Sequence, residues 1–351
     1  MRRARASTLA LFAVSVLLGN CKRVEEPLAD ERTVHPSRAK PSAADATPTP
    51  SAAQVALAAP TPRLTLPSSA YQASLFADDE AIELLTSTAA HRLLPGKEPL
   101  TRAIALGFAA TVTRKSYVYW SQGALWSEPR STPKPSGATK LGALPTQPQR
   151  IVADISGDEF ALVMHAAGAQ DTIAKLDHQR LKTLYTSPGS IDALTMIGDA
   201  LYFVERPGST GFRLGRVRFS GGEAIFSNDK SGRAPALLRG TRELVYYDGA
   251  RRDVLGSSPD LQHERVLAKD FICSPLAALA NVYCSTMEGV FELTENAPPR
   301  QIVPASRKLI TNLAVNSRQL AFITDVGAQG EDRLSLYSVP LSNTNAAAAP
   351  P

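Results

Sequence analysis

The chain has 351 residues, of which 44% are hydrophobic, and this length allows one large domain or two ordinary ones with a packed core. Its formal net charge of +5 lies almost wholly in the first 63 residues, so residues 64–351 are nearly neutral. Because a protein that binds nucleic acid needs a basic surface against the phosphates, this distribution argues against a nucleic-acid partner.

Residues 1–20 have the features of a secretory signal peptide. Arg2, Arg3 and Arg5 form a basic start, and an almost wholly apolar run follows at residues 9–18. That run is about half as long as the roughly 20 residues that a transmembrane helix needs. The sequence therefore predicts export rather than a membrane-spanning segment.

Residues 17–21, Leu-Leu-Gly-Asn-Cys, resemble the lipobox of bacterial lipoproteins. The resemblance implies that Cys21 is lipidated and becomes the mature N-terminus. Lys22 stands where Asp would signal retention at the inner membrane, so the resemblance implies an outer-membrane location, on the periplasmic or surface side. Asn20 stands where Gly, Ala or Ser is usual, and the alternative is ordinary cleavage nearby, which would release a soluble periplasmic or secreted protein.

Residues 21–62 form the next segment, and from residue 22 onward it holds seven prolines and no aromatic residue. Such a sequence cannot bury enough apolar surface to offset the entropy of ordering, so we expect a disordered tether. A partner-binding motif within it is the alternative. Residues 342–351, rich in Asn, Ala and Pro, are expected to be a disordered tail.

A short apolar run recurs about every 40 residues in the remaining chain, 63–341. The runs begin at Ile82, Val118, Phe160, Leu201, Leu244, Val282 and Leu320. Another β-rich segment precedes each run, and a third and fourth follow most of them. This period is typical of propeller blades, so the sequence predicts an all-β fold, a β-propeller of seven four-stranded blades.

The two ends of the repeat region are complementary. The last repeat lacks a fourth strand, and residues 63–66, Arg-Leu-Thr-Leu, are a spare strand before the first repeat. A strand from one terminus that completes the blade at the other would close the ring. Two alternatives are six blades with residues 64–90 as an appendage, and an open pair of β-sandwiches.

Two stretches carry a family resemblance. Residues 117–126, with Tyr-Val-Tyr-Trp followed by Gly-Ala-Leu-Trp, and residues 214–222 resemble the repeats of bacterial, notably myxobacterial-type, propeller lipoproteins. The resemblance covers roughly residues 64–341. It implies the propeller fold and an envelope location, and it implies no particular reaction.

Cys273 and Cys284 remain once Cys21 is assigned to the anchor. They flank a predicted β-hairpin, and export would take the chain into an oxidising compartment, so we expect a disulfide between them. Two free buried thiols are the alternative, because a register error of one residue would place the side chains on opposite sides of the sheet.

Other chemistry-bearing residues are dispersed. The five histidines lie in different segments without metal-ligand spacing, and no catalytic nucleophile motif is present. Five aspartates at strand ends are expected to form turns, with cation binding at a channel mouth as the alternative; they are Asp154, Asp158, Asp199, Asp248 and Asp325. Trp120 and Trp126 are expected to pack between blades rather than to hold a sugar.

These features predict a lipid-anchored, non-catalytic binding or scaffold module of the cell envelope. We expect no cofactor, a membrane contact through the lipid, and a protein or a peptidoglycan or other polysaccharide as partner. An extracytoplasmic lyase or hydrolase with its site at the mouth of the propeller channel is the alternative. Inner strands rich in Ala, Leu, Val and Thr favour the binding module over the enzyme.

Overall fold

The computed structural model describes residues 59–67, 73–106, 109–131, 137–144, 146–165, 170–230, 236–239, 243–274, 276–279, 281–305, 309–325 and 333–341. All of them belong to the unit Val55–Pro351. The leader, Cys21, residues 21–58 of the expected tether and the tail lie outside the described residues.

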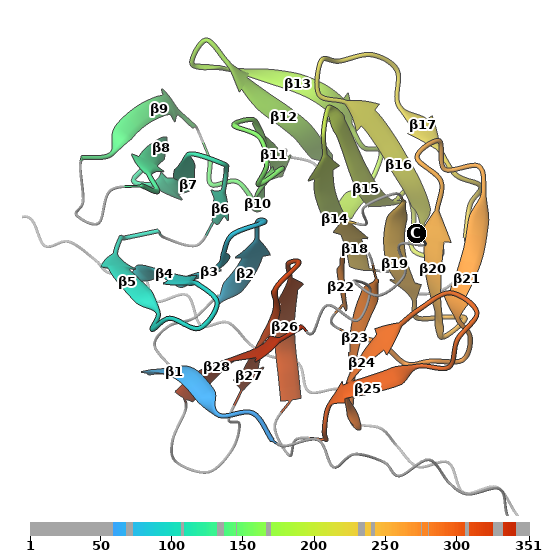
Figure 1. The fold of residues 1–351 in the computed structure, drawn as a ribbon. Helices are drawn as coiled ribbons and strands as arrows, with labels where there is room; N and C mark the ends of the chain where they lie inside the picture. The colour runs from blue at the N-terminus through green and yellow to red at the C-terminus, as the bar shows by residue number, and fades with distance from the viewer. Residues whose placement is uncertain are drawn as a thin grey trace, which may run out of the picture. The chain divides into compact units, whose positions relative to one another are not determined.

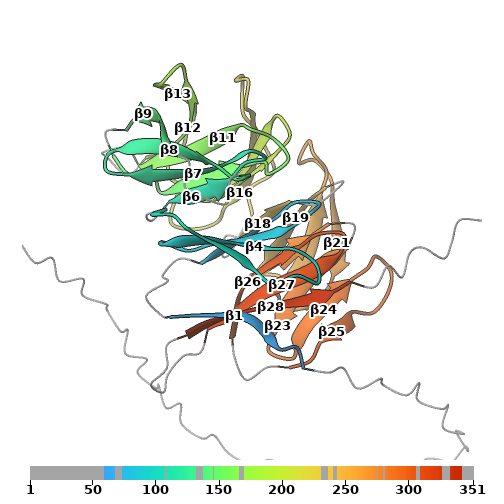
Figure 2. The ribbon, with the colours of Figure 1, turned by 60° about the vertical axis from the view of Figure 1, so that its left-hand side comes forward.

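The described chain forms seven antiparallel four-stranded sheets, and within the first six sheets the strands follow one another in chain order (Figures 1 and 2). The first strands are β2 (Ser74–Ala77), β6 (Ala110–Val112), β10 (Arg150–Ala153), β14 (Ser190–Ile197), β18 (Ala236–Arg239), β22 (Leu276–Ala278) and β26 (Leu309–Val315). The second strands are β3 (Ile82–Leu85), β7 (Ser116–Ser121), β11 (Phe160–His165), β15 (Ala200–Arg206), β19 (Leu244–Asp248), β23 (Val282–Thr286) and β27 (Gln319–Asp325).

The outer half of each sheet consists of a third and a fourth strand. The third strands are β4 (Ala89–Leu93), β8 (Ala124–Pro129), β12 (Asp171–Asp177), β16 (Arg213–Arg218), β20 (Asp253–Ser257), β24 (Gly289–Leu293) and β28 (Arg333–Pro340). The fourth strands are β5 (Leu100–Ala103), β9 (Thr139–Ala143), β13 (Arg180–Thr186), β17 (Ile225–Phe226), β21 (Glu264–Ala268), β25 (Arg300–Val303) and β1 (Pro62–Pro67).

The sheets are blades of a seven-bladed β-propeller. Each first strand contacts the first strand of the next blade from β6 round to β26 and β2, and β3 contacts β6, so the ring is continuous. The predicted fold class is thereby confirmed, and the six-blade and sandwich alternatives are excluded. None of the described segments is a helix long and apolar enough to cross a membrane.

The N-terminal strand closes the ring, as the spare strand in the sequence predicted. β1 pairs antiparallel with β28, with Leu64 opposite Leu336 and Leu66 opposite Leu334. The last blade therefore has the order β1-β28-β27-β26, and strands from both ends of the domain hold it together. Joining the termini in one sheet leaves no blade with an unpaired seam.

The hydrophobic core is divided into seven clusters, each between two adjacent blades. β15 shows why. Leu201 and Phe203 pack against the blade before it, whereas Ala200, Tyr202 and Val204 pack against the blade after it. Successive side chains of a strand point to opposite faces of the sheet, so a central strand that is buried on both faces has a continuous apolar sequence.

A tyrosine–carboxylate–cation group recurs among the blades. In one example the Tyr185 hydroxyl donates to Glu205 Oε1 at 2.5 Å, and Arg213 Nε donates to Glu205 Oε2 at 2.5 Å. The other groups are Tyr117–Glu83–Arg130, Tyr246–Glu264–Lys230 and Tyr283–Glu292–Arg300. A carboxylate inside a protein needs such donors, because burial without them costs several kcal/mol.

Cys273 and Cys284 form the expected disulfide. Cys273 lies just before β22 and Cys284 lies in β23, and their Cα atoms are 5.5 Å apart. Both side chains are fully buried among the residues that join two blades. The hairpin register therefore places the two side chains on the same side of the sheet.

Candidate functional site

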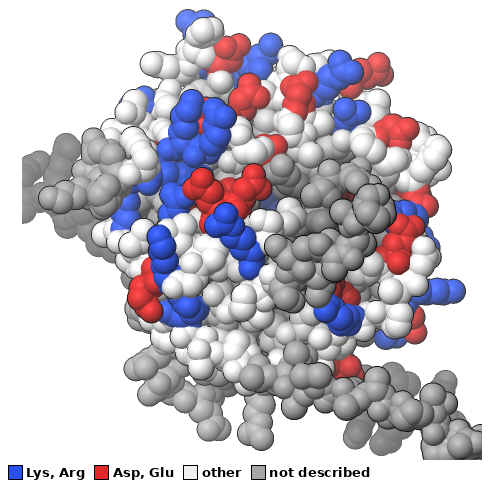
Figure 3. Space-filling model, in the orientation of Figure 1, with Lys and Arg blue, Asp and Glu red and all other residues white. Residues whose placement is uncertain are grey.

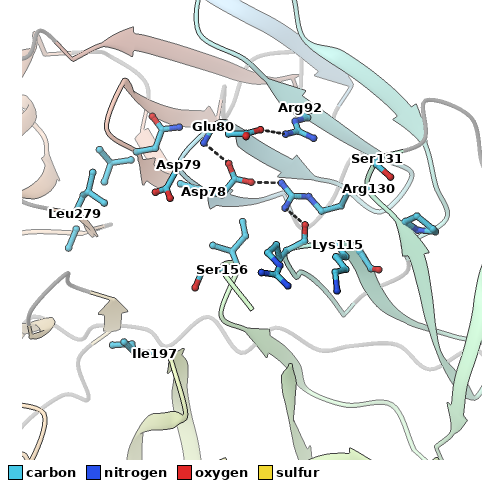
Figure 4. A pocket seen from close by; sticks show the side chains of 18 residues that line it. Asp78, Asp79, Glu80, Arg92, Lys115, Arg130, Ser131, Ser156, Ile197 and Leu279 are labelled. Carbon is cyan, nitrogen blue, oxygen red and sulfur yellow. Dashed lines mark hydrogen bonds and ion pairs between the residues drawn. The ribbon is translucent and has the colours of Figure 1, made fainter. Parts of the chain in front are cut away.

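A cavity of about 980 Å³ opens where the first strands of the blades end. We call this side of the ring the mouth face and define it by the turns at residues 78–81, 113–115, 154–159, 198–199 and 316–318, each of which joins the first strand of a blade to the second. Figure 4 shows the side chains that line the cavity. Its volume is that of a typical site for a small ligand or a short chain segment.

Arg130 holds one wall of the cavity together. It follows β8, and its side chain is only 6% exposed. Its Nη2 donates to Asp78 Oδ2 at 2.6 Å and to Glu83 Oε1 at 2.8 Å, both in the first blade. Its Nη1 donates to the backbone carbonyls of Thr113 and Arg114 in its own blade, at 3.0 Å and 3.1 Å. One guanidinium therefore links the first blade to the second (Figure 4).

Asp78 serves two purposes in this wall. Its Oδ1 accepts hydrogen bonds from the backbone N–H groups of Glu80 at 2.9 Å and Ala81 at 2.7 Å, which shapes the turn after β2. Its Oδ2 binds Arg130. Burial alone would raise the pKa of Asp78, but the hydrogen bonds from Arg130 and the two backbone groups lower it below its usual range.

Arg130 and Tyr117, which both contact Glu83, are also held in fixed charge states. Burial lowers the pKa of Arg130, but the carboxylates of Glu83 and Asp78 outweigh that effect and raise it. Burial and the Glu83 carboxylate together raise the pKa of Tyr117, whose hydroxyl donates to Glu83 Oε2 at 3.1 Å. Arg130 therefore stays charged and Tyr117 stays neutral at physiological pH.

The rim of the cavity carries more exposed charges of both signs. Arg114 and Lys115 are 61% and 69% exposed, and both reach Asp158 of the third blade, at 3.3 Å and 2.7 Å. On the first blade, Glu80 lies 3.4 Å from Arg92. Figure 3 shows basic and acidic side chains next to one another on the visible face, rather than a patch of one sign.

The opposite wall is apolar. Ile197 of the fourth blade, Ala278 and Leu279 of the sixth, and Val315 of the seventh contribute aliphatic side chains. Figure 4 shows Ile197 and Leu279 on the side of the cavity away from Arg92 and its neighbours. Below the mouth, a further cavity of about 390 Å³ runs between the first strands and is lined mostly by Ala, Val, Ile and Leu. The cavity is therefore amphipathic, with a charged wall facing an aliphatic one.

Two donors in these walls have no hydrogen-bond acceptor among the described residues. They are Nδ2 of Asn316 and Nε of Arg130, and each atom is buried. Asn316 is 2% exposed, and its Oδ1 accepts from the backbone N–H groups of Arg318 and Gln319, so the amide cannot rotate without breaking a turn. Buried donors of this kind favour a ligand that offers acceptors.

Four of the five strand-end aspartates hold turns or rim contacts. The carboxylate of Asp154 accepts from Ser156 and from the backbone N–H of Gly198 at 2.8 Å, and Asp158 pairs with the rim cations. Asp199 accepts from Ser220, and Asp248 shapes its own turn. Asp325 ends β27, and its side chain lies outside the described part. No group of three His, Cys, Asp or Glu side chains that could hold a metal ion occurs among the described residues.

The described histidines and the tryptophans also lie in structural surroundings. His91 Nδ1 lies 2.9 Å from Thr101 Oγ1, and burial lowers its pKa. His165 pairs with Asp171, His178 is exposed beside Asp177, and His263 lies in a turn. Trp126 packs in the cluster between the first two blades and Trp120 in the next cluster, so the predicted packing of both between blades is confirmed.

Sequence reasoning missed the residues that form the cavity. Asp78, Arg130 and Asn316 are turn residues. Polar side chains in turns usually contact solvent and form no binding site. One signal was available: Glu83 is the single charged residue within the seven apolar runs. A charge in a strand that is buried on both faces requires a buried counter-ion, and Arg130 is that counter-ion.

No protein-family model matches the sequence, and a comparison with curated proteins gives no match. Several solved structures are similar at low identity. A chain of the nidogen/laminin complex is 14% identical over 65% of this chain and 93% of its own, with a TM-score of 0.43. BamB from Moraxella catarrhalis is 13% identical over 76% of this chain and 84% of its own, with a TM-score of 0.44.

The extracellular domain of a putative hybrid two component system from B. thetaiotaomicron is also similar. It is 12% identical over 76% of this chain, with a TM-score of 0.47, and the match spans 38% of that longer chain. At these values the comparisons describe fold likeness alone. The function must be argued from the cavity itself.

The two groups that hold the charged wall together have pKa values shifted away from the operating pH. A general acid or base works best with a pKa near the operating pH, whereas the pKa of Asp78 is lowered and that of Arg130 is raised. The hydroxyl of Ser156, one of the serines in the lining, donates to the Asp154 carboxylate at 2.7 Å. The arrangement offers fixed charges, an aliphatic surface and unpartnered donors.

Proposed function

We propose that this chain is an exported, lipid-anchored binding module of the cell envelope that takes its ligand or partner into the cavity on the mouth face. The observation that carries the proposal is the amphipathic cavity, one wall of which is held by the Asp78–Arg130–Glu83 network. A preorganised site loses little conformational entropy on binding. The rigid ring presents the turns that surround it.

Three further features support the envelope location. The leader and the sequence around Cys21 predict export and an outer-membrane lipid anchor. The disulfide between Cys273 and Cys284 is typical of a protein that folds in an oxidising compartment. The tether predicted at residues 21–62 would hold the propeller away from the membrane, within reach of a protein or polysaccharide of the envelope.

Site-specific photocrosslinking in cells that express the full chain tests the proposal. A photoreactive amino acid replaces Lys115 at the rim of the cavity and, as a matched control, Lys182 on the fourth strand of the third blade. Both positions are exposed. We expect a discrete crosslinked product from position 115 and none from position 182.

A cavity-filling substitution completes the test. Ala278→Trp places an indole in the mouth, whereas Ala143→Trp places one on the exposed outer strand β9. The product from position 115 should disappear with Ala278→Trp and persist with Ala143→Trp. Products that form equally from both lysine positions, or that persist when the cavity is filled, would overturn the proposal.

A further inference from the structure

We infer that the ligand of the mouth cavity is an extended peptide segment in which aliphatic residues alternate with charged ones. This inference rests on the proposed function and names the class of its ligand. It is carried by three features of the cavity: two walls of opposite character, charges of both signs, and buried donors without acceptors.

The two walls fit the periodicity of an extended chain. In an extended segment, successive side chains point in opposite directions, so residues i and i+2 share a face. A segment lying between the two walls would direct alternate side chains to opposite sides. One set would face the charged wall around Arg130, and the other set would face the aliphatic wall around Leu279. An extended tetrapeptide spans roughly 13 Å, and a cavity of about 980 Å³ has room for one.

The rim charges indicate which polar residues the segment carries. Asp79 and Glu80 lie on the first blade, and Arg114 and Lys115 lie on the second. A ligand with one basic and one acidic side chain on its polar face would meet a charge of opposite sign at each place. A ligand with charges of only one sign would be repelled at one of them.

The unpartnered donors indicate a backbone. Asn316 Nδ2 and Arg130 Nε are buried and lack hydrogen-bond acceptors among the described residues. A peptide offers a carbonyl oxygen at every residue without adding net charge. A buried donor without an acceptor carries the free-energy cost of its lost hydration, and a hydrogen bond to a ligand carbonyl would offset that cost.

A polysaccharide fits the same walls less well. Sugar rings bind through their C–H groups to the faces of aromatic side chains, and none of the described residues that line this cavity is aromatic. Both tryptophans pack between blades instead. The aliphatic wall therefore favours aliphatic side chains over a saccharide.

Peptide binding by the purified full chain tests the inference. The probe is the N-acetylated, C-amidated tetrapeptide Lys-Leu-Glu-Leu, in which the charged residues share one face. The control is Lys-Glu-Leu-Leu, which has the same composition without the alternation. By isothermal titration calorimetry, we expect the alternating peptide to bind at least tenfold more tightly. Equal affinity of the two peptides would overturn the inference, as would tighter binding of the saccharide N-acetylchitotetraose.

Asn316→Asp examines the donor itself. The substitution keeps the oxygen that accepts from Arg318 and Gln319, so the turn should remain, but it replaces the amide donor with a second carboxylate oxygen. We expect affinity for the alternating peptide to fall about tenfold with an unchanged melting temperature. Asn228→Asp, an exposed position, is the matched control and should bind as the parent does. Unchanged affinity in Asn316→Asp would show that this donor does not meet the ligand.

The outcomes separate this inference from the proposed function. If both peptides fail to bind while the crosslink at position 115 still disappears with Ala278→Trp, the cavity is a binding site and the peptide assignment is wrong. If the crosslink is insensitive to Ala278→Trp, the proposed function itself fails.

Discussion

Arg130→Met should destabilise the propeller more than most substitutions of a turn residue. The guanidinium is 6% exposed and contacts Glu83, whose side chain is fully buried. Methionine matches only the unbranched part of the arginine side chain and has no charge, so the substitution leaves the Glu83 carboxylate buried without its main counter-ion. Removing one partner of a buried ion pair costs about 3–5 kcal/mol.

The structure places this cost near the lower end of that range. Glu83 keeps the Tyr117 hydroxyl at 3.1 Å and Arg92 Nε at 3.7 Å, and Asp78, at 19% exposed, keeps its two backbone hydrogen bonds. We therefore expect a loss of about 3 kcal/mol at neutral pH. For a domain of this size, that corresponds to a fall in melting temperature of roughly 6–12 °C.

The pH dependence gives an independent check. The pKa of Asp78 is lowered in the folded chain, so its interactions stabilise the fold above the unfolded value of 3.8 and are lost as the pH falls through the folded value. Arg130→Met removes part of that contribution. The difference in melting temperature between parent and variant should therefore be largest near pH 7 and smaller near pH 3.

Thermal unfolding followed by circular dichroism measures both effects. The double variant Glu83→Gln with Arg130→Met removes the buried charge together with its counter-ion, and it should recover part of the lost stability. A loss below 1 kcal/mol in Arg130→Met would refute the reasoning. So would a double variant whose loss equals the sum of the two single losses.

Three other substitutions test separate parts of the structure. A Cβ added at Gly215 would lie 2.2 Å from the ring of the buried Phe203, so Gly215→Ala should cost about 1–3 kcal/mol, measured by urea unfolding, and an unchanged midpoint would contradict the tight contact. Replacing Cys273 and Cys284 together by Ala should cost up to about 3 kcal/mol from the loss of the closed loop, and thiol counting on the denatured, unreduced parent should find neither of them free. Cys21→Ser should move the protein from the membrane to the soluble fraction, and continued membrane association would argue against lipidation there.

The repeat pattern made most of the fold predictable. All seven second strands lie where the apolar runs placed them, because a strand buried on both faces has a continuous apolar sequence. Closure by residues 63–66 was predictable because the last repeat lacked a strand. β4, β5 and β20 were not predicted. β4 carries His91 and Arg92 within its five residues, and their partners, Thr101, Glu80 and Glu83, lie elsewhere in the same blade.

The candidate site was much less predictable than the fold. Its walls come from strand ends and turns of six blades, so residues far apart in the sequence become neighbours only once the ring has closed. Arg130 lies before a stretch rich in Pro, Ser and Thr. Its local sequence does not distinguish it from a solvated loop residue. Its role follows from Glu83, which lies 47 residues away in the chain.

Hydroxyl-radical footprinting of the chain in its own membranes, compared with the purified chain, tests binding at the mouth most directly. Leu279 lines the cavity, whereas Met287 is 84% exposed in the turn between β23 and β24, on the opposite face of the ring. The proposed function predicts that oxidation of Leu279 falls in the membranes while that of Met287 does not change. Protection of Met287 with full oxidation of Leu279 would contradict it, because the partner would then occupy the other face.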